Sequence, residues 1–240
     1  MIKQKVLIDN IPSIIWGKSS SRVFIAVHGF MSNKEDKVIE LLAKQAVNKG
    51  YQVISFDLPQ HGERKGSAVL FEPKICVNDL NNIMSYAQIF FSSISLFACS
   101  IGVYFSLQAY NNEMIKQSLF LSPIVDMRQM IENMMEKDDI TITRLQAEKK
   151  IFTTSGQVLD WDWYQYVLEN PIVNWNNKTS ILYGSLDDQC AYNVINKFVN
   201  KYHCEFDIVK GADHFFYTKE QLMNFTYWLE KNIIDNIDSK

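Results

Sequence analysis

The 240-residue chain lacks several features that mark other classes of protein. No apolar run approaches the roughly 20 residues that a membrane helix needs. The first residues hold two lysines but no long apolar stretch after them, so they do not resemble a signal peptide. No basic block is present and the formal net charge is -3, which argues against nucleic acid as a partner. We therefore expect a cytoplasmic protein that does not span a membrane.

Cysteine and histidine are also scarce, with four residues of each. The cysteines form no C-x-x-C pair, and no cluster of cysteine and histidine has zinc spacing. We expect free thiols in a reducing compartment, with no metal and no organic cofactor. The few histidines leave few candidates for a catalytic base.

Hydrophobic residues make up 47% of the chain, enough for the core of one domain with a sizeable insertion. Short apolar runs alternate with amphipathic stretches, which predicts βαβ units and a mostly parallel central sheet flanked by helices. A hairpin at 5–8 and 13–16 is expected at one edge of the sheet. The other predicted strands are 22–27, 51–56, 94–98, 118–121, 180–183 and 205–209, and the main predicted helices are 36–49, 74–90, 191–202 and 219–233.

The segment Ala98-Cys99-Ser100-Ile101-Gly102 lies between a predicted strand and a predicted helix. A serine at the apex of such a turn presents a nucleophilic hydroxyl, and the usual pattern is G-x-S-x-G. Ala98 stands where the first glycine is expected, which adds one methyl group at a crowded position. The turn therefore predicts Ser100 as a nucleophile, which requires a base and an acid elsewhere in the chain.

Only two histidines follow Ser100, and they differ in position. His203 precedes a predicted strand, at the wrong end of a parallel sheet, whereas His214 follows the last predicted strand and is the expected base. Asp187, which follows the strand near residue 180, is the expected acid. Asp188 is interpreted as a loop or helix-capping carboxylate, and Asp126 stays open as an alternative acid. The order Ser, Asp, His is that of an α/β-hydrolase sheet.

An oxyanion formed by attack of the serine needs two backbone N–H donors. Ile101, the first residue of the helix after the nucleophile, supplies one unpaired N–H group. The second is expected from Phe30, in the loop that follows the strand ending at Val27. His28 in that loop is interpreted as a structural residue that bonds the loop backbone.

Five motifs at the ends of predicted strands together resemble those of the α/β-hydrolase superfamily. The resemblance is to small esterases and lipases and to their serine aminopeptidase-like (S33-type) relatives, and it spans residues from about 22 to 230. Gln60 and Arg64 depart from the glycine and serine that are usual in the second motif. The motifs are His28-Gly29-Phe30, Asp57-Leu58-Pro59-Gln60-His61-Gly62-Glu63-Arg64, the Ser100 turn, Gly184-Ser185-Leu186-Asp187 and Gly211-Ala212-Asp213-His214.

The regular alternation of strands and helices breaks between residues 124 and 176. By the resemblance, this segment is a helical cap, inserted before the strand near residue 180 into a core formed by 1–123 and 177–240. It carries apolar residues at helical spacing and a tryptophan-rich stretch. These residues bury the cap against the core, and some of them are expected to line an apolar, aromatic substrate pocket. The candidates are Met127, Met130, Met134, Trp161 and Trp163.

The resemblance and the candidate triad predict a serine hydrolase that cleaves a carboxylic ester or thioester through an acyl-enzyme intermediate. A peptidase or amidase with the same triad stays open, with Glu132, Glu136 or Asp162 as possible partners for a substrate amine. A non-catalytic ligand-binding protein on this fold is the third alternative. The expected partner is a small ester or acyl substrate, and the sequence gives no prediction of oligomeric state.

Overall fold

An eight-stranded β-sheet organises the chain, for which the computed structural model describes residues 1–235. The last residues of the predicted core segment, 236–240, lie outside this described part. The spatial order of the strands is β1-β2-β4-β3-β5-β6-β9-β10. Their bounds are β1 Lys3–Ile8, β2 Ile11–Trp16, β3 Arg22–Val27, β4 Gln52–Phe56, β5 Ser93–Cys99, β6 Ser118–Leu121, β9 Thr179–Gly184 and β10 Glu205–Val209.

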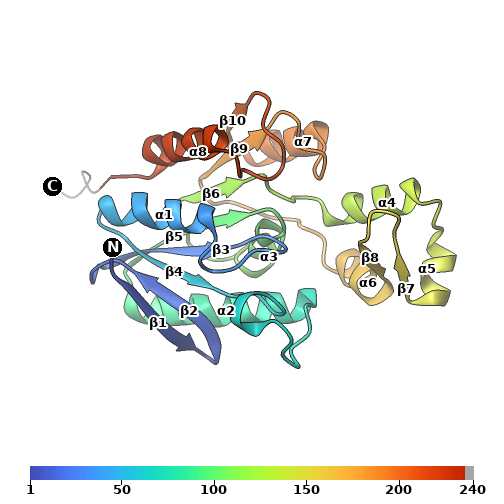
Figure 1. Cartoon of the computed structure of the whole chain (residues 1–240), viewed down its shortest axis with the longest axis horizontal. Coiled ribbons are helices and arrows are strands. Elements are labelled where there is room, and N and C mark those ends of the chain that lie inside the picture. The colour runs from blue at the N-terminus through green and yellow to red at the C-terminus, as the bar shows by residue number, and fades with distance from the viewer. Residues whose placement is uncertain (236–240) are drawn as a thin grey trace.

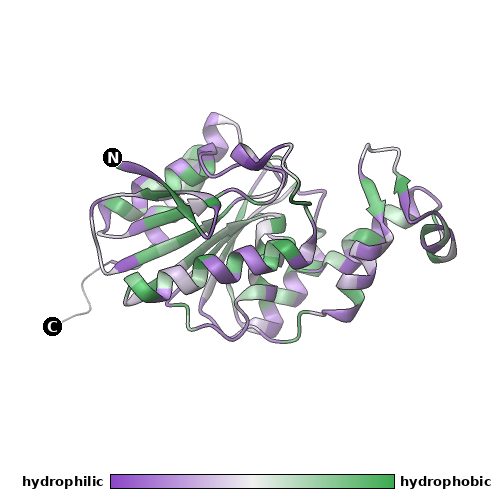
Figure 2. Ribbon diagram, turned by 90° about the horizontal axis from the view of Figure 1, so that it is seen from below, coloured by the Kyte–Doolittle hydropathy of each residue, from purple (hydrophilic) through white to green (hydrophobic). Residues whose placement is uncertain are grey.

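The strands from β4 to β10 pair in parallel, and only β2 runs against its neighbours. The predicted hairpin at one edge of the sheet is therefore confirmed, as β1 and β2. The central strands are buried along almost their whole length, as expected for a parallel sheet that helices cover on both faces. In Figure 2 the strands inside the molecule are mostly green, the colour of hydrophobic residues.

Helices cover both faces of the sheet and bury two separate apolar clusters. Residues of α1 and α8 belong to one cluster, and residues of α2, α3 and α7 belong to the other. Figure 1 shows α1 beside α8, with α2 across the sheet from them. The bounds are α1 Lys37–Asn48, α2 Pro73–Phe90, α3 Ile101–Ala109, α7 Tyr192–Tyr202 and α8 Lys219–Asn232, with a short 3₁₀ helix, η1, at Gly62–Arg64.

Local signals explain where several helices begin. The carboxylate of Asp36 accepts a hydrogen bond from the backbone N–H of Lys37 and caps α1, and Pro73 occupies the first turn of α2. Thr218 and Gln221 form a reciprocal capping box at the start of α8. In residues 1–235 we find no helix with both the length and the apolar character needed to cross a bilayer.

The segment between β6 and β9 forms a lobe that projects from one end of the molecule (Figure 1). We call residues 124–176 the insertion. It contains three helices and, in addition, an antiparallel hairpin of two three-residue strands that the sequence did not predict. Its elements are α4 Met127–Lys137, α5 Ile142–Glu148, β7 Lys150–Phe152, β8 Val158–Asp160 and α6 Trp161–Glu169.

Candidate active site

Ser100 occupies a sharp turn between β5 and α3. Its backbone has φ 52° and ψ -126°, a conformation that a residue with a side chain rarely adopts. Two backbone hydrogen bonds hold the turn: Ser100 N–H donates to the carbonyl of Leu121 (3.0 Å), and Ile124 N–H donates to the carbonyl of Ser100 (3.2 Å). The serine side chain is thus fixed at the carboxyl end of the central strand and remains partly exposed.

The two small residues that flank this turn are under different steric demands. A Cβ added to Gly102 would lie 2.5 Å from the carbonyl oxygen of His28 and 3.0 Å from that of Val27, so a side chain cannot fit there. Ala98 is fully buried in β5, paired with Val27 of β3. The turn therefore forms with alanine in place of the first glycine, while the second glycine is required by close backbone approach.

Ser100, His214 and Asp187 come together although 114 and 27 positions separate the hydrogen-bonded pairs along the chain. His214 Nε2 lies 2.8 Å from Ser100 Oγ, and His214 Nδ1 lies 2.8 Å from Asp187 Oδ2. Because a carboxylate oxygen only accepts, the neutral imidazole carries its proton on Nδ1. Nε2 is then free to accept the serine proton, which is the arrangement of a nucleophile, a base and an orienting acid.

The carboxylate of Asp187 is held from its other side by backbone donors. Its Oδ1 accepts from the N–H groups of Gln189 (2.9 Å) and Cys190 (3.1 Å), so Oδ2 points at the imidazole. Asp188 instead accepts from the side chain of Gln189 (2.9 Å). Asp126 caps α4 by accepting from the N–H of Gln129 (2.9 Å). Of the three carboxylates considered from the sequence, Asp187 is the one that contacts His214.

The two residues expected to supply the oxyanion donors lie near Ser100: Ile101 follows it directly in the chain, and Phe30 belongs to the loop whose Gly29 approaches it. Ile101 is the first residue of α3, and a Cβ at Gly29 would lie 3.0 Å from the Cβ of Ser100, which places the loop of Phe30 next to the nucleophile. Within residues 1–235, neither the Ile101 N–H nor the Phe30 N–H donates to a protein acceptor.

His28 and His61 connect the loop after β3 with the loop after β4, because each ring accepts a hydrogen bond from the backbone of the other loop. His28 Nε2 accepts from the N–H of Leu58 (3.0 Å), and His61 Nε2 accepts from the N–H of Met31 (3.1 Å). Each Nδ1 faces a carbonyl at 2.7 Å, that of Gly29 for His28 and that of Pro59 for His61. Burial lowers the pKa of His28 to about 4 and also lowers the pKa of His61. Both rings are thus neutral at pH 7.

A buried ion pair joins the same two loops. Lys34 Nζ contacts Asp57 Oδ2, and the side chains are 4% and 0% exposed. Asp57 also accepts from the N–H groups of Lys34 and Glu63, both at 2.9 Å. The sequence analysis missed this pair, since Lys34 lies in a polar stretch typical of a solvated loop. In the sequence, the one indication of a special role for Asp57 is its position directly after a predicted buried strand.

The five candidate pocket residues of the insertion differ in their surroundings. Met127 is 4% exposed and lies in the apolar core, and Met130 and Met134 are partly buried against it. Trp163 contacts two aromatic rings of the main domain, with centroids 5.3 Å from Phe71 and 6.2 Å from Phe105. The ring of Trp161 lies 6.2 Å from that of Tyr164, within the insertion. Of these two tryptophans, Trp163 is the one whose ring contacts Phe71 and Phe105 outside the insertion.

Aromatic side chains connect the insertion to the loop of Phe30. The Phe71 ring lies 5.6 Å from the Phe30 ring and 4.9 Å from the His61 ring. Phe30 is 51% exposed, so one face of this aromatic group is open. We call Phe30, Phe71 and Trp163 the aromatic wall, which packs on the fully buried ring of Phe105.

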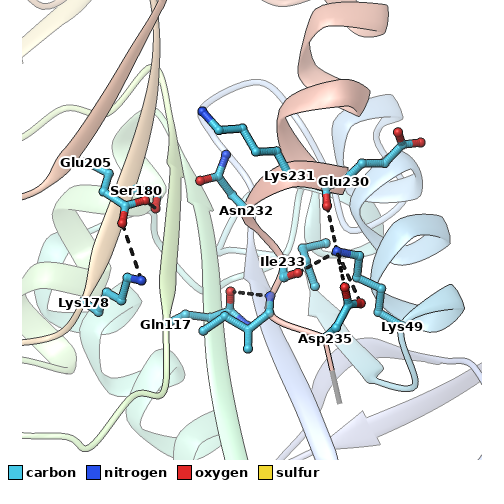
Figure 3. A pocket seen from close by; sticks show the side chains of 11 residues that line it. Lys49, Gln117, Lys178, Ser180, Glu205, Glu230, Lys231, Asn232, Ile233 and Asp235 are labelled. Carbon is cyan, nitrogen blue, oxygen red and sulfur yellow. Dashed lines mark hydrogen bonds and ion pairs between the residues drawn. The ribbon is translucent and has the colours of Figure 1, made fainter. Parts of the chain in front are cut away.

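The cavity of about 380 Å³ shown in Figure 3 lies at the amino ends of β6, β9 and β10, whereas Ser100 follows the carboxyl end of β5. Its charged groups are already paired. Lys49 Nζ donates to the carbonyls of Glu230 and Ile233, both at 2.7 Å, and Lys178 pairs with Glu205 at 3.5 Å. In residues 1–235 no three side chains of histidine, cysteine, aspartate or glutamate are grouped so as to hold a metal ion.

Comparisons with known proteins give matches in structure only: no family model and no curated protein sequence matches the chain. Est1E from Butyrivibrio proteoclasticus, solved with ferulic acid, has a TM-score of 0.77 at 15% identity, covering 95% of this chain and 96% of its own. Mouse alpha/beta hydrolase domain-containing protein 10 has a TM-score of 0.74 at 13% identity, covering 96% and 98%. The Pyrococcus furiosus esterase Pf2001 has a TM-score of 0.68 at 14% identity, covering 96% and 89%.

These similarities extend over nearly the whole chain. The fold predicted from the motifs is therefore confirmed: the chain has the α/β-hydrolase fold.

Proposed function

We propose that this protein is a serine hydrolase that cleaves a carboxylic ester or thioester through an acyl-enzyme intermediate. The observation that carries the proposal is the continuous hydrogen-bonded series from Ser100 Oγ through His214 to Asp187, with 2.8 Å at each step. The strained backbone at Ser100 adds support, because such strain persists where the surrounding structure holds a functional group in place.

In the proposed reaction, His214 Nε2 takes the proton of Ser100 Oγ as the oxygen attacks the carbonyl carbon of the substrate. The N–H groups of Phe30 and Ile101 donate to the oxyanion, and Asp187 stabilises the imidazolium. His214 then gives its proton to the departing alkoxide or thiolate, which leaves Ser100 acylated. Water, deprotonated by His214, attacks the acyl carbonyl and releases the acid.

The aromatic wall supports a preference for bulky apolar or aromatic acyl groups. It begins at the proposed oxyanion donor Phe30 and ends at Trp163 in the insertion. An acyl chain whose carbonyl is bound at Phe30 and Ile101 can lie along this wall, and we propose that the insertion acts as the cap that covers it. The structurally similar Est1E was solved with a bound aromatic acid, ferulic acid, which agrees with this assignment.

The test is labelling with a fluorophosphonate, combined with turnover of p-nitrophenyl esters, a thioester and an aminoacyl anilide. We expect the wild type to be labelled and to hydrolyse the esters, and Ser100→Ala to lose both properties. Labelling that survives Ser100→Ala would refute the nucleophile, and preferred turnover of the anilide would identify a peptidase instead.

Trp163→Ala tests the acyl site, with Trp161→Ala as the matched control from the same helix. One aromatic contact contributes about 1 kcal/mol. Its loss in Trp163→Ala should lower kcat/KM for an aromatic acyl ester roughly 5- to 10-fold relative to kcat/KM for an acetyl ester. Trp161→Ala should leave this ratio unchanged. Equal changes in the two variants would contradict the assignment of the wall.

A further inference from the structure

The hydrogen bond from Met31 N–H to His61 Nε2 links a histidine outside the triad to the proposed oxyanion loop. Met31 directly follows Phe30 in the chain and has φ 59°, so the turn at these two residues depends on an external partner to hold it. That partner is His61, at 3.1 Å from Met31 N. Resting on the function proposed above, we propose that His61 is a positioning residue that holds the Phe30 N–H toward the oxyanion.

The protonation state of His61 is set by what each nitrogen faces. The carbonyl of Pro59, 2.7 Å from Nδ1, can only accept, so Nδ1 carries the proton. The N–H of Met31 can only donate, so Nε2 must be unprotonated. A proton added to Nε2 would make it a donor that faces the N–H donor of Met31, so this hydrogen bond would be lost.

The groups around His61 favour its neutral form. The ring is packed against Phe30, Phe71 and His28, with centroid distances of 5.5, 4.9 and 5.2 Å. His28 is itself neutral and fully buried, and its own hydrogen bonds are made with the backbone. Asp57 is the anion near His61, and its carboxylate is already bound by Lys34. Burial lowers the pKa of His61, so Met31 stays bound at neutral pH and is released in acid.

The proposed activity should therefore be lost in acid through the protonation of two histidines. The proposed base, His214, must be unprotonated to take the serine proton, and His61 must be unprotonated to hold the oxyanion turn. At low pH kcat/KM should therefore fall about 10-fold further than a triad acting alone allows, so the logarithm of kcat/KM has a slope steeper than 1 while His61 titrates.

Two variants separate positioning from packing. In His61→Gln the side-chain carbonyl can reach the place of Nε2 and accept from Met31, but it does not titrate. In His61→Leu the ring volume is largely kept and no acceptor remains. Loss of a complete oxyanion donor costs on the order of 10²- to 10³-fold in kcat. A displaced donor should cost less, so we expect about a 10-fold loss of kcat in His61→Leu with KM little changed.

The measurement is kcat/KM of a p-nitrophenyl ester between pH 4.5 and 8, expressed per active site by fluorophosphonate titration, with circular dichroism at each pH to establish that the protein is folded. We expect His61→Gln to keep most of the wild-type activity at pH 8 and to show an acid limb with a slope of 1 throughout, without the steeper region of the wild type. A slope of 1 in the wild type, or an equal loss of kcat in both variants, would overturn the proposal. If His61→Leu does not fold, the slopes of the wild type and His61→Gln decide.

Failure of the function proposed above has a separate signature. In that case the wild type would not be labelled, or Ser100→Ala would still be labelled, whatever the His61 variants do. A labelled, active wild type with unaltered pH profiles in both variants refutes only the role of His61.

Discussion

Acid should destabilise this protein through His28, a histidine outside the proposed triad. Burial lowers the pKa of His28 to about 4 from the 6.5 of an exposed imidazole. As the pH falls, the unfolded chain therefore binds a proton at this residue before the folded chain does. The free energy of unfolding decreases from about pH 6.5 downward, and the loss from this residue is complete once the pH passes below about 4.

The size of this effect follows from the two pKa values. Each unit of difference corresponds to about 1.4 kcal/mol, so the loss attributable to His28 reaches about 2 kcal/mol at pH 5 and about 3 kcal/mol at pH 4. A domain of this kind is stable by only about 5 to 15 kcal/mol. One residue would then account for a substantial part of the acid sensitivity.

The assay is urea unfolding at several pH values from 7 to 4, followed by tryptophan fluorescence, for the wild type and His28→Gln. The glutamine carbonyl can replace Nε2 as the acceptor for Leu58 N–H, while the donor to Gly29 is lost. We expect the variant to be less stable at pH 7, with a flatter dependence on pH. Other titrating groups are common to both proteins, so curves that run parallel down to pH 4 would refute the reasoning.

Three further substitutions test other contacts. Gly184→Ala places a Cβ 2.4 Å from a backbone carbonyl of the loop that carries the proposed base, so kcat should fall at least about 10-fold; an unchanged kcat would show that the loop can move freely. Lys34→Met leaves Asp57 buried without its cation and should cost about 3 to 5 kcal/mol in urea unfolding, with part recovered on adding Asp57→Asn; no recovery would indicate a packing defect. Asp187→Asn should lower kcat by about 10⁴-fold whereas Asp126→Asn should not, and the reverse result would reassign the acid.

The sequence was sufficient for those parts of the fold where a local pattern is long and unambiguous. The apolar runs of the central strands, each closed by glycine, proline or a polar residue, predicted the parallel sheet. Ser100, Asp187 and His214 could be selected because each directly follows a predicted strand and because only two histidines follow the serine. Strand ends in a parallel sheet converge at one edge, so their proximity required no further information.

The hairpin in the insertion could not be predicted because its strands are only three residues long. In β7, Lys150 and Phe152 are exposed and only Ile151 is buried, so the alternation covers three residues and cannot be distinguished from a loop. The pairing of Lys34 with Asp57 could not be predicted from the sequence for a different reason. It is a contact between two loops, and the sequence of neither loop indicates that the lysine is buried.

The contacts that the sequence did not reveal are the ones that determine the position of Phe30. The loop after β3 carries Phe30, and it has no regular structure of its own up to the start of α1. It is held by the loop after β4 through hydrogen bonds in both directions: His28 accepts from Leu58 N–H, and His61 accepts from Met31 N–H. A turn held by two neutral histidines is fixed at pH 7 without a positive charge on either ring. The second of the five motifs, which contributes no residue to the proposed triad, thus acts on the proposed chemistry by fixing the first.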